Sequence, residues 1–352
     1  MTDAYVALED GRVVEARARA PGRTRGELVF TTAYTGYEES LTDPSYEEQI
    51  LTFSYPLIGN YGVREERFES DRVHPRGVVA RDLTEDVAEW LENEGVPAVD
   101  ELDTRDLVTS IREQGAMKCG IAAGPDATAA DAEVELDACK AMSDHTDIGS
   151  RVSIEESVTY NPDGDGPTVA LIDCGAKGSI ASSLVERDAT VEVVPYDATV
   201  ADVEAVDPDV LFISNGPGDP ENFEAAAALV EEYVGDTPLA GICLGQQVIA
   251  NALGGETEKM EFGHRGVNQP VRDLRSNKVV MTTQNHGYTV AEPGDLEVTQ
   301  INVNDDTPEG LESDELEIIT RQYHPEANPG PHDTLGFFDD VLALADPPSA
   351  EH

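Results

Sequence analysis

The amino-acid sequence predicts an α/β protein with two domains, the second of which is a doubly wound, mostly parallel sheet. Beyond residue 167, apolar runs of strand length alternate with segments of helical periodicity. This pattern is typical of a parallel sheet with helices on both faces. At 352 residues, the chain is long enough for two separate hydrophobic cores. We expect a mixed α/β domain over residues 1–150, a linker over 151–167 and the doubly wound domain over 168–352.

The first domain is predicted from a small number of short elements. Strand-like runs occur at residues 27–32 and 49–54. One helix follows a cap at Thr84 and ends at Gly95. A second helix starts at Asp103 or Thr104 and ends at Gly115. This half of the chain shows no catalytic motif, and its fold is expected to be mixed α/β or α+β.

The linker is predicted from the segment YNPDGDGP at residues 160–167, where turn-forming residues replace all hydrophobic periodicity. After it, strands are expected at residues 168–173, 191–196, 209–214, 238–242 and 316–320, and helices at residues 180–187, 225–233 and 246–253. The turn at residues 174–179 lacks the spacing of a phosphate loop, so we expect it to be structural. Ligands of such sheets bind at the carboxyl ends of the strands.

Cys243 falls at this predicted edge, in the motif Gly241-Ile242-Cys243-Leu244-Gly245. It is the cysteine form of an elbow that holds a nucleophile on a sharp turn between a strand and a helix. Glycines on both sides fit so tight a turn. The thiolate would face backbone N–H groups and the positive end of the helix dipole, both of which stabilise it. The alternative for this motif alone is a buried structural cysteine.

His324-Pro325-Glu326 follows 81 residues after the cysteine. The proline favours an extended conformation for His324, and on an extended segment His324 and Glu326 would point to one face. A carboxylate beside an imidazole fixes its tautomer and suits a general base for a cysteine. A surface pair without catalytic meaning is the alternative for any single His-x-Glu.

The charge of the chain restricts its partners. The formal net charge is −48, the pI is near 4.1, and lysine occurs only at Lys118, Lys140, Lys177, Lys259 and Lys278. The acidic residues are spread along the sequence, so they are expected to coat a folded surface whose self-repulsion molar salt would screen. We expect a salt-adapted protein, and we exclude nucleic acid and anionic membranes as partners.

The cysteines and the termini exclude further classes. Cys119, Cys139, Cys174 and Cys243 form no C-x-x-C pair and have no histidines at zinc spacing, so no disulfide framework and no metal site are predicted. The amino terminus has no signal-peptide pattern, and no apolar run has the length of a membrane span. A cytoplasmic location is expected.

Three motifs together carry a specific resemblance. The run at residues 241–247, the loop Asn215-Gly216-Pro217-Gly218-Asp219-Pro220 and the His324-Pro325-Glu326 segment resemble the class I glutamine amidotransferase family over roughly residues 168–346. The segments at residues 35–46, 55–62, 81–83, 103–105 and 262–271 resemble the small subunit of carbamoyl phosphate synthetase. The second resemblance extends over nearly the whole chain and selects one branch of the broader family.

This resemblance implies that Cys243 attacks the side-chain amide of glutamine, that His324 acts as acid and base, and that Glu326 orients His324. It implies an oxyanion site at the backbone N–H groups of Gly218 and Leu244. By the same resemblance, glutamine is bound by Ser45, Gly216, Gly218, Leu244, Gln247, Asn285, Gly287 and Tyr288. From the residues alone, Ser45 is a turn residue after Asp43-Pro44, and Asn285 to Gly287 form a β-turn.

The resemblance also implies a partner. Ammonia would pass to a large subunit that holds ATP and magnesium and makes carbamoyl phosphate from bicarbonate, for arginine and pyrimidine synthesis. No cofactor is expected in this chain, which has no phosphate loop. The alternative is an amidotransferase subunit of another synthase, such as one for anthranilate or GMP. The presence of the first domain argues against this alternative. An inactive docking or regulatory subunit is a further alternative, although both Cys243 and His324 are present.

Overall fold

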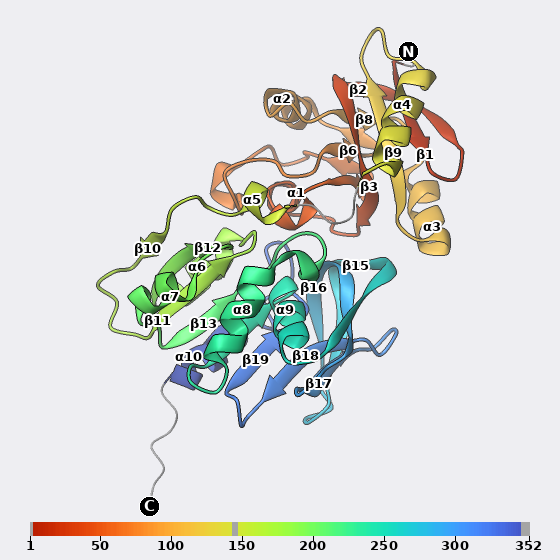
Figure 1. Ribbon diagram of the computed structural model, residues 1–352. Coiled ribbons are helices and arrows are strands. Elements are labelled where there is room, and N and C mark those ends of the chain that lie inside the picture. The colour runs from red at the N-terminus through yellow and green to blue at the C-terminus, as the bar shows by residue number, and fades with distance from the viewer. Residues whose placement is uncertain (1–2, 143–146, 346–352) are drawn as a thin grey trace, which may run out of the picture. The chain divides into compact units, whose positions relative to one another are not determined.

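The computed structural model describes residues 3–142 and 147–345, which form two compact units (Figure 1). The first unit comprises residues 1–144 and 260–266, and the second comprises residues 145–259 and 267–352. Within the described residues, no helix combines the length and apolar character needed to cross a membrane.

The second unit is built on a ten-stranded sheet in the order β10-β12-β11-β13-β14-β19-β18-β17-β15-β16. The strands are β10 (Val158–Tyr160), β11 (Thr168–Asp173), β12 (Thr190–Pro195), β13 (Val210–Ile213), β14 (Leu239–Ile242), β15 (Glu256–Asp273), β16 (Val279–Glu292), β17 (Glu297–Asn302), β18 (Pro308–Ser313) and β19 (Ile318–Arg321). Strands β12, β11, β13, β14 and β19 are parallel, whereas β10 and the strands from β18 to β15 are antiparallel additions.

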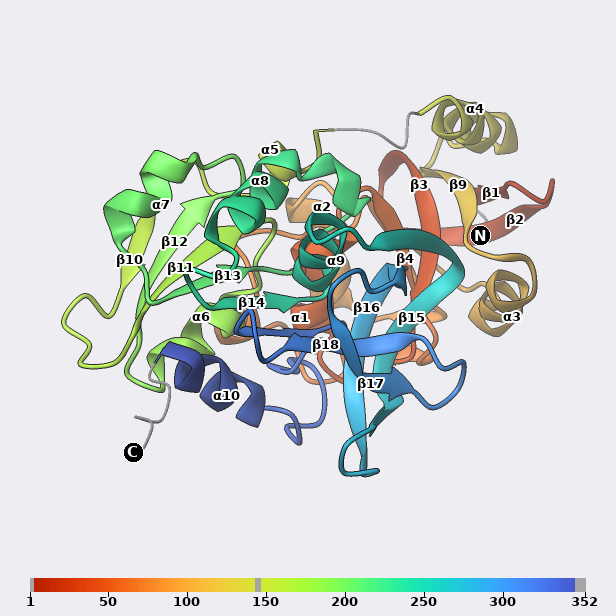
Figure 2. The same cartoon turned by 60° about the horizontal axis from the view of Figure 1, so that its bottom comes forward.

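Helices cover both faces of the parallel strands (Figure 2). The helices of this unit are α5 (Gly149–Val152), α6 (Gly178–Val185), α7 (Val200–Val206), η3 (Pro220–Asn222), α8 (Glu224–Tyr233), α9 (Leu244–Ala252) and α10 (Gly336–Ala345). Side chains of α7, α8 and α9 pack on one face, where β11 contributes Ala170 and Ile172. Side chains of α6 and α10 pack on the other face against Val169 and Leu171. Successive side chains of a strand point to opposite faces, so β11 is apolar throughout.

These layers confirm the predicted doubly wound sheet, but about half of its strands were not expected. The residues of β15 are mostly part-exposed and polar, so they give no apolar alternation. Strand β10 lies within the segment predicted as a linker, and its three residues are all exposed. It pairs with β12 through the backbone, an interaction that leaves no pattern in the side chains.

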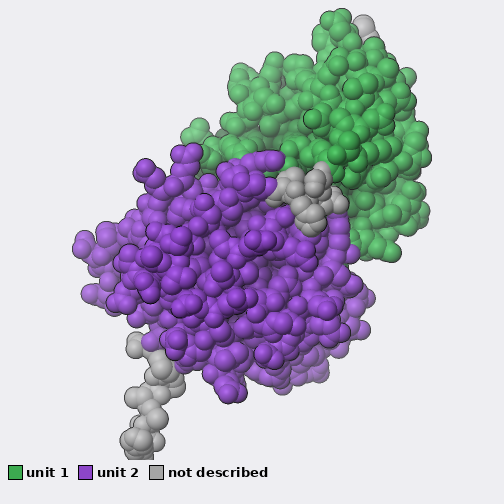
Figure 3. All heavy atoms as spheres, viewed as in Figure 1, with its two compact units in different colours: residues 1–144, 260–266 green, residues 145–259, 267–352 purple. Residues whose placement is uncertain are grey.

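The first unit is the green part of Figure 3. Its strands form a closed barrel in the order β1-β2-β8-β6-β4-β3-β9. Its strands are β1 (Ala4–Leu8), β2 (Val13–Ala20), β3 (Gly22–Thr31), β4 (Gln49–Phe53), β6 (Gly77–Val79), β8 (Ala98–Asp100) and β9 (Met117–Ala123), and a separate pair joins β5 (Leu57–Ile58) to β7 (Asp82–Leu83). Every barrel strand contributes to one apolar cluster, which fills the interior together with residues of α3. The prediction of a mixed α/β domain is therefore confirmed, while closure into a barrel was not predicted.

Helices lie outside this barrel, namely α1 (Tyr37–Leu41), η1 (Pro44–Tyr46), η2 (Glu65–Arg67), α2 (Glu85–Asn93), α3 (Thr104–Gln114) and α4 (Ala129–Lys140). Both predicted ends of α3 are confirmed. The Asp103 carboxylate accepts a hydrogen bond from the Asp106 N–H at the start of the helix, and Gly115 follows its last residue with φ +93°. Thr84 precedes α2 as predicted, but its side chain makes no capping hydrogen bond.

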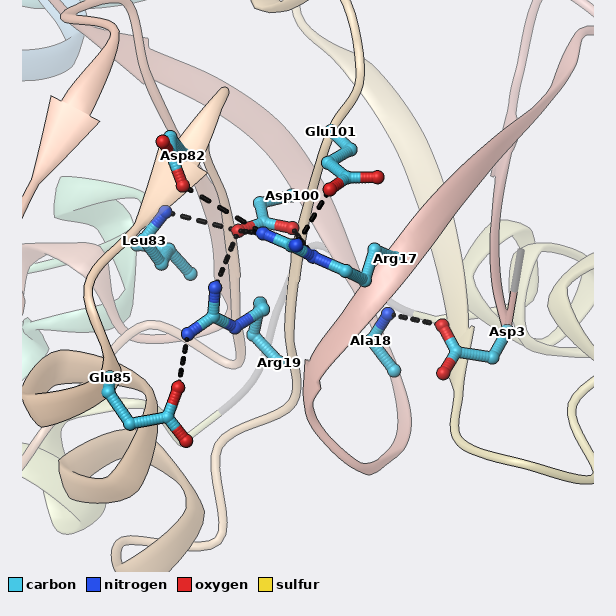
Figure 4. A network of polar contacts seen from close by, with 9 residues as sticks. All are labelled: Asp3, Arg17, Ala18, Arg19, Asp82, Leu83, Glu85, Asp100 and Glu101. Carbon is cyan, nitrogen blue, oxygen red and sulfur yellow. Dashed lines mark hydrogen bonds and ion pairs between the residues drawn. The ribbon is translucent and has the colours of Figure 1, made fainter. Parts of the chain in front are cut away.

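A buried carboxylate links the barrel strands β2 and β8 to strand β7 of the separate pair (Figure 4). Asp100, at the end of β8, is fully buried. Both of its oxygens accept from Arg17 at 2.8 Å, and one also accepts from Arg19 at 3.2 Å and from the Leu83 N–H at 3.1 Å. The Asp100 hydrogen bonds raise the pKa of the Arg17 guanidinium further. Arg19 extends the network to Glu85 at the start of α2.

Candidate active site

Cys243 occupies the turn between β14 and α9, as the sequence predicts. Its backbone has φ 53° and ψ −104°, a region that a non-glycine residue adopts only when its surroundings enforce it. A Cβ on Gly245 would overlap the carbonyl oxygen of Ile213, and one on Gly241 would lie 2.8 Å from the carbonyl carbon of Gly245. Only glycine fits at either position, so the two glycines allow the strained cysteine between them.

His324 reaches the cysteine because β19 is the parallel neighbour of β14. The Cys243 N–H donates to the Arg321 carbonyl at 2.7 Å, which aligns the ends of the two strands. The His324 N–H then donates to the carbonyl of Thr283 at 2.8 Å and anchors the segment to β16. The imidazole and the thiol therefore lie at the carboxyl ends of adjacent strands.

Glu326 meets the imidazole, although not through the extended geometry that the sequence suggests. His324 forms an isolated bridge, but the following Pro325 and Glu326 lie in a turn that the Ala327 N–H closes on the His324 carbonyl at 3.1 Å. Within this turn, His324 Nδ1 donates to Glu326 Oε1 at 2.6 Å. The expected pairing is present, while the extended conformation is wrong beyond His324.

Lys177 completes this arrangement and was not predicted. It lies just before α6, in the turn expected to be structural, and its side chain is 2% exposed. Its Nζ donates to Glu326 Oε1 at 3.0 Å and to the Ala327 carbonyl at 2.7 Å. The position of Lys177 after a buried strand, at the carboxyl edge of the sheet, was the available signal.

The charges of this group reinforce one another. Burial alone would raise the pKa of Glu326, but the Lys177 ammonium and the His324 imidazolium lower it to about 2. Burial would likewise lower the pKa of His324, but the Glu326 carboxylate and the neighbouring Cys243 raise it to about 10. At neutral pH the group therefore holds an ammonium, a carboxylate and an imidazolium beside the sulfur of Cys243.

Two atoms of this group have unused hydrogen-bonding capacity. Within the described residues, His324 Nε2 and Glu326 Oε2 are buried without a hydrogen bond of normal geometry. The Cys243 thiol donates weakly to the Asn285 carbonyl, with Sγ and the oxygen 3.7 Å apart. His324 Nε2 and Glu326 Oε2 therefore retain the capacity for a further hydrogen bond.

Among the other predicted residues of the second unit, Gly216 contacts the residue after the cysteine and Asn285 contacts its thiol. A Cβ on Gly216 would lie 2.7 Å from the Leu244 side chain, so the loop after β13 packs against the first residue of α9. Gly218, two residues further along this loop, has φ +82°. Asn285 contacts the thiol, and Gln247 Nε2 donates to the Tyr288 carbonyl at 2.9 Å.

Gln247 also donates to Gln322 Oε1 at 3.2 Å, so both N–H groups of its amide are bound within the protein. Only its carbonyl oxygen could accept from a ligand. Gly287 lies in β16 between Asn285 and Tyr288. Ser45 belongs to the first unit, where it lies in η1 and its N–H donates to Asp43 Oδ1 at 2.9 Å.

Comparison with known proteins relates both halves of the chain to described families. A family described as "Glutamine amidotransferase class-I" matches residues 170–344, and one described as "Carbamoyl-phosphate synthase small chain, CPSase domain" matches residues 6–121. A carbamoyl phosphate synthase small chain of Halobacterium salinarum is 71% identical over 346 residues, covering 98% of each chain.

More distant relatives carry the same description. The small chain of Archaeoglobus fulgidus is 44% identical and covers 96% of this chain and 97% of its own. That of Methanocaldococcus jannaschii is 42% identical, with coverages of 98% and 99%. The high identity to a relative from a halophile agrees with the salt-adapted surface that the charge predicts.

Proposed function

The chain belongs to the carbamoyl phosphate synthase small chain family, with a class I glutamine amidotransferase domain, and we propose that it hydrolyses glutamine at Cys243 through a thioester. The observation that carries this proposal is the buried group of Cys243, His324, Glu326 and Lys177 at the carboxyl edge of the sheet. A strained nucleophile beside a charged imidazole is suited to acyl transfer.

In the first half of the reaction, the thiol proton of Cys243 has passed to His324, and the resulting thiolate attacks the side-chain carbonyl carbon of glutamine. The imidazolium of His324 stabilises the thiolate, because opposite charges attract strongly in a buried site. The N–H groups of Gly218 and Leu244 receive the developing oxyanion, and such donors contribute roughly 3 kcal/mol each to transition-state stabilisation. His324 gives its proton to the departing nitrogen, which leaves as ammonia, and a glutamyl thioester remains.

In the second half, neutral His324 takes a proton from water as the water attacks the thioester. Glutamate and the thiolate form, and His324 is again an imidazolium. Glu326 keeps the ring in one orientation throughout, and Lys177 keeps Glu326 ionised. Gly216, Gln247, Asn285, Gly287 and Tyr288 of the second unit would bind the glutamine, as in the related family.

We propose that the released ammonia is used by a second, larger chain. A larger chain with ATP and magnesium would combine it with bicarbonate to give carbamoyl phosphate for arginine and pyrimidine synthesis. An enclosed path between the two chains would keep ammonia from protonation in bulk water. The similarity to small chains over almost the full length supports this partner.

The test compares Cys243→Ala with the wild type, each co-purified with the larger chain in molar KCl. We expect glutamate release to fall at least about 1,000-fold, since the nucleophile is lost. Synthesis from added ammonium should remain within about twofold, because that route needs no thioester. Cys139→Ala, which removes a buried thiol of the first unit, is the control. Glutamine-dependent synthesis by the Cys243→Ala complex would refute the mechanism.

A further inference from the structure

Gln322 is a buried glutamine of the second unit that the proposed reaction does not use. It follows β19 directly, two residues before His324, and its side chain is fully buried. Its backbone N–H donates to the Glu309 carbonyl at 2.9 Å, which fixes the main chain at this point. Its Oε1 accepts from Gln247 Nε2 at 3.2 Å, whereas its own Nε2 makes no hydrogen bond within residues 3–142 and 147–345.

Burial of the Gln322 amide has a cost that its contacts must explain. A buried polar group without a hydrogen bond loses the free energy of its hydration, and Nε2 of Gln322 is in this position within the described residues. A methionine of similar length would fill the same space without this cost. What the glutamine adds is the acceptor that its Oε1 offers to Gln247. The hydrogen bond to Gln247 therefore distinguishes a glutamine from an apolar residue at this position.

The amide of Gln247 has one possible orientation. Gln247 lies in α9, one helical turn after Cys243. Its amide faces the Tyr288 carbonyl at 2.9 Å, and because a carbonyl can only accept, the nitrogen and not the oxygen must lie there. The second N–H of this nitrogen meets Gln322 Oε1. The carbonyl oxygen of Gln247 is then the one atom of its amide that can bind a ligand, and it can only accept.

Two partners hold this amide more firmly than one. The two N–H groups and the carbonyl of an amide lie in one plane. With Tyr288 as its only partner, the amide could rotate about a single hydrogen bond. With Gln322 as well, two contacts fix the plane, and the carbonyl oxygen of Gln247 points in one direction. The two partners come from different segments, since Tyr288 lies in β16 and Gln322 follows β19.

We propose that Gln322 is a positioning residue for glutamine binding, which accepts from Gln247 and so holds the Gln247 carbonyl oxygen toward a hydrogen-bond donor of the substrate. Glutamine has such donors in its ammonium group and its amide. This role rests on the proposed function, because it requires Gln247 to contact glutamine. The contact is the same in bound substrate and in the transition state, so its loss weakens binding and leaves the turnover of bound substrate nearly unchanged.

The test measures glutamate release by Gln322→Met in the complex with the larger chain. Methionine has a similar length and no acceptor oxygen. We expect the KM for glutamine to rise about fivefold, the factor that corresponds to one hydrogen bond between neutral groups. The kcat should stay within about twofold. Gln269→Met is the matched control and should leave both constants unchanged, because Gln269 Oε1 also accepts from an amide at 3.2 Å but does so at a partly exposed position of β15.

Gln247→Met shows whether Gln322 acts through Gln247. This variant should itself raise the KM at least about fivefold. The double variant should have the KM of Gln247→Met alone, because no amide then remains for Gln322 to hold. A KM of the double variant that equals the product of the two single effects would overturn the inference. An unchanged KM for Gln322→Met beside a raised KM for Gln247→Met would overturn it as well.

Binding measured without turnover separates this inference from the proposed mechanism. In a complex that carries Cys243→Ala, calorimetry gives the Kd of glutamine in the absence of reaction. Adding Gln322→Met should raise this Kd about fivefold, whatever the chemistry at Cys243. An unchanged Kd would refute the role of Gln322 alone. An unchanged KM for Gln247→Met would refute the assigned role of Gln247 and that of Gln322 with it, whereas no binding of glutamine to the parent complex would refute the proposed function itself.

Denaturant unfolding in molar KCl checks that the variants fold. Gln322→Met removes an Nε2 that has no partner within the described residues, so we expect unfolding near the wild-type midpoint. Should methionine not fit, Gln322→Ala removes the amide without adding bulk, and the same rise in the KM with an unchanged kcat is expected. A lowered kcat with an unchanged KM in either variant would place Gln322 in the chemical step and would overturn the inference.

Discussion

Asp100 of the first unit and Glu326 of the second are both fully buried carboxylates, but they differ in how completely they are paired. Asp100 accepts from two guanidinium groups and a backbone N–H, and both of its oxygens have partners. Glu326 has two donors on Oε1, while its Oε2 has none within the described residues. The Nε2 of its neighbour His324 likewise makes no hydrogen bond of normal geometry within the described residues.

This difference distinguishes a fully paired buried network from one that retains unpaired atoms. Buried polar groups in folded proteins are nearly always hydrogen-bonded, because an unpaired group costs the free energy of its lost hydration. The Asp100 network meets this requirement and holds the barrel strands together. The His324 group does not, and we interpret its unused capacity as the place where a substrate and its leaving group bind.

Asp100→Asn should produce the largest effect on stability. The asparagine amide has no negative charge, and its N–H groups would face the guanidinium of Arg17 or Arg19. The two positive charges then lack a buried counter-charge, so we expect a loss of roughly 3 kcal/mol in the free energy of unfolding. Denaturant unfolding in molar KCl measures it. Glutamine kinetics should stay at wild-type values wherever the variant is folded. A variant that unfolds at the wild-type midpoint would show that the network does not stabilise the barrel.

Glu326→Gln should act mainly on the reaction. Without the carboxylate, burial dominates and the pKa of His324 falls from about 10. The imidazolium is then lost at a lower pH, so the alkaline limb of kcat/KM moves downward from near pH 10, and at neutral pH the rate falls about 100-fold. A pH profile of glutamate release checks both effects. An alkaline limb at the wild-type position would mean that Glu326 does not set the charge of His324.

Glu85→Gln should have the smallest effect, although Glu85 belongs to the same network as Asp100. It binds Arg19 at 2.9 Å, but its side chain is 89% exposed. Exposed ion pairs contribute little to stability and are screened by salt. We therefore expect the free energy of unfolding to change by no more than about 0.5 kcal/mol. The same denaturant experiment applies. A loss as large as that of Asp100→Asn would show that burial is not what distinguishes the two carboxylates.

Much of the active site could be predicted because its signals are local. The glycines around Cys243 are close in sequence and are required by the turn itself. His324 and Glu326 lie two residues apart, so their pairing could be predicted even though the extended geometry offered for it was wrong. The alternation of buried strands and helices likewise predicted the parallel half of the sheet.

Other features depend on segments that are distant in the chain. The barrel closes through strand pairs such as β4 with β6 and β2 with β8, whose short runs carry no information about their partners. The antiparallel strands β15 to β18 are too polar to show an apolar period.

By itself, the sequence determined which residue is the candidate nucleophile, which histidine serves it and which kind of sheet presents them. These properties follow from neighbouring residues, because turn geometry and strand periodicity are local. Only the tertiary structure decided the charge state of the site, since Lys177 reaches Glu326 across 149 residues. The strength of an ion pair depends on distance and burial, and a linear pattern contains neither.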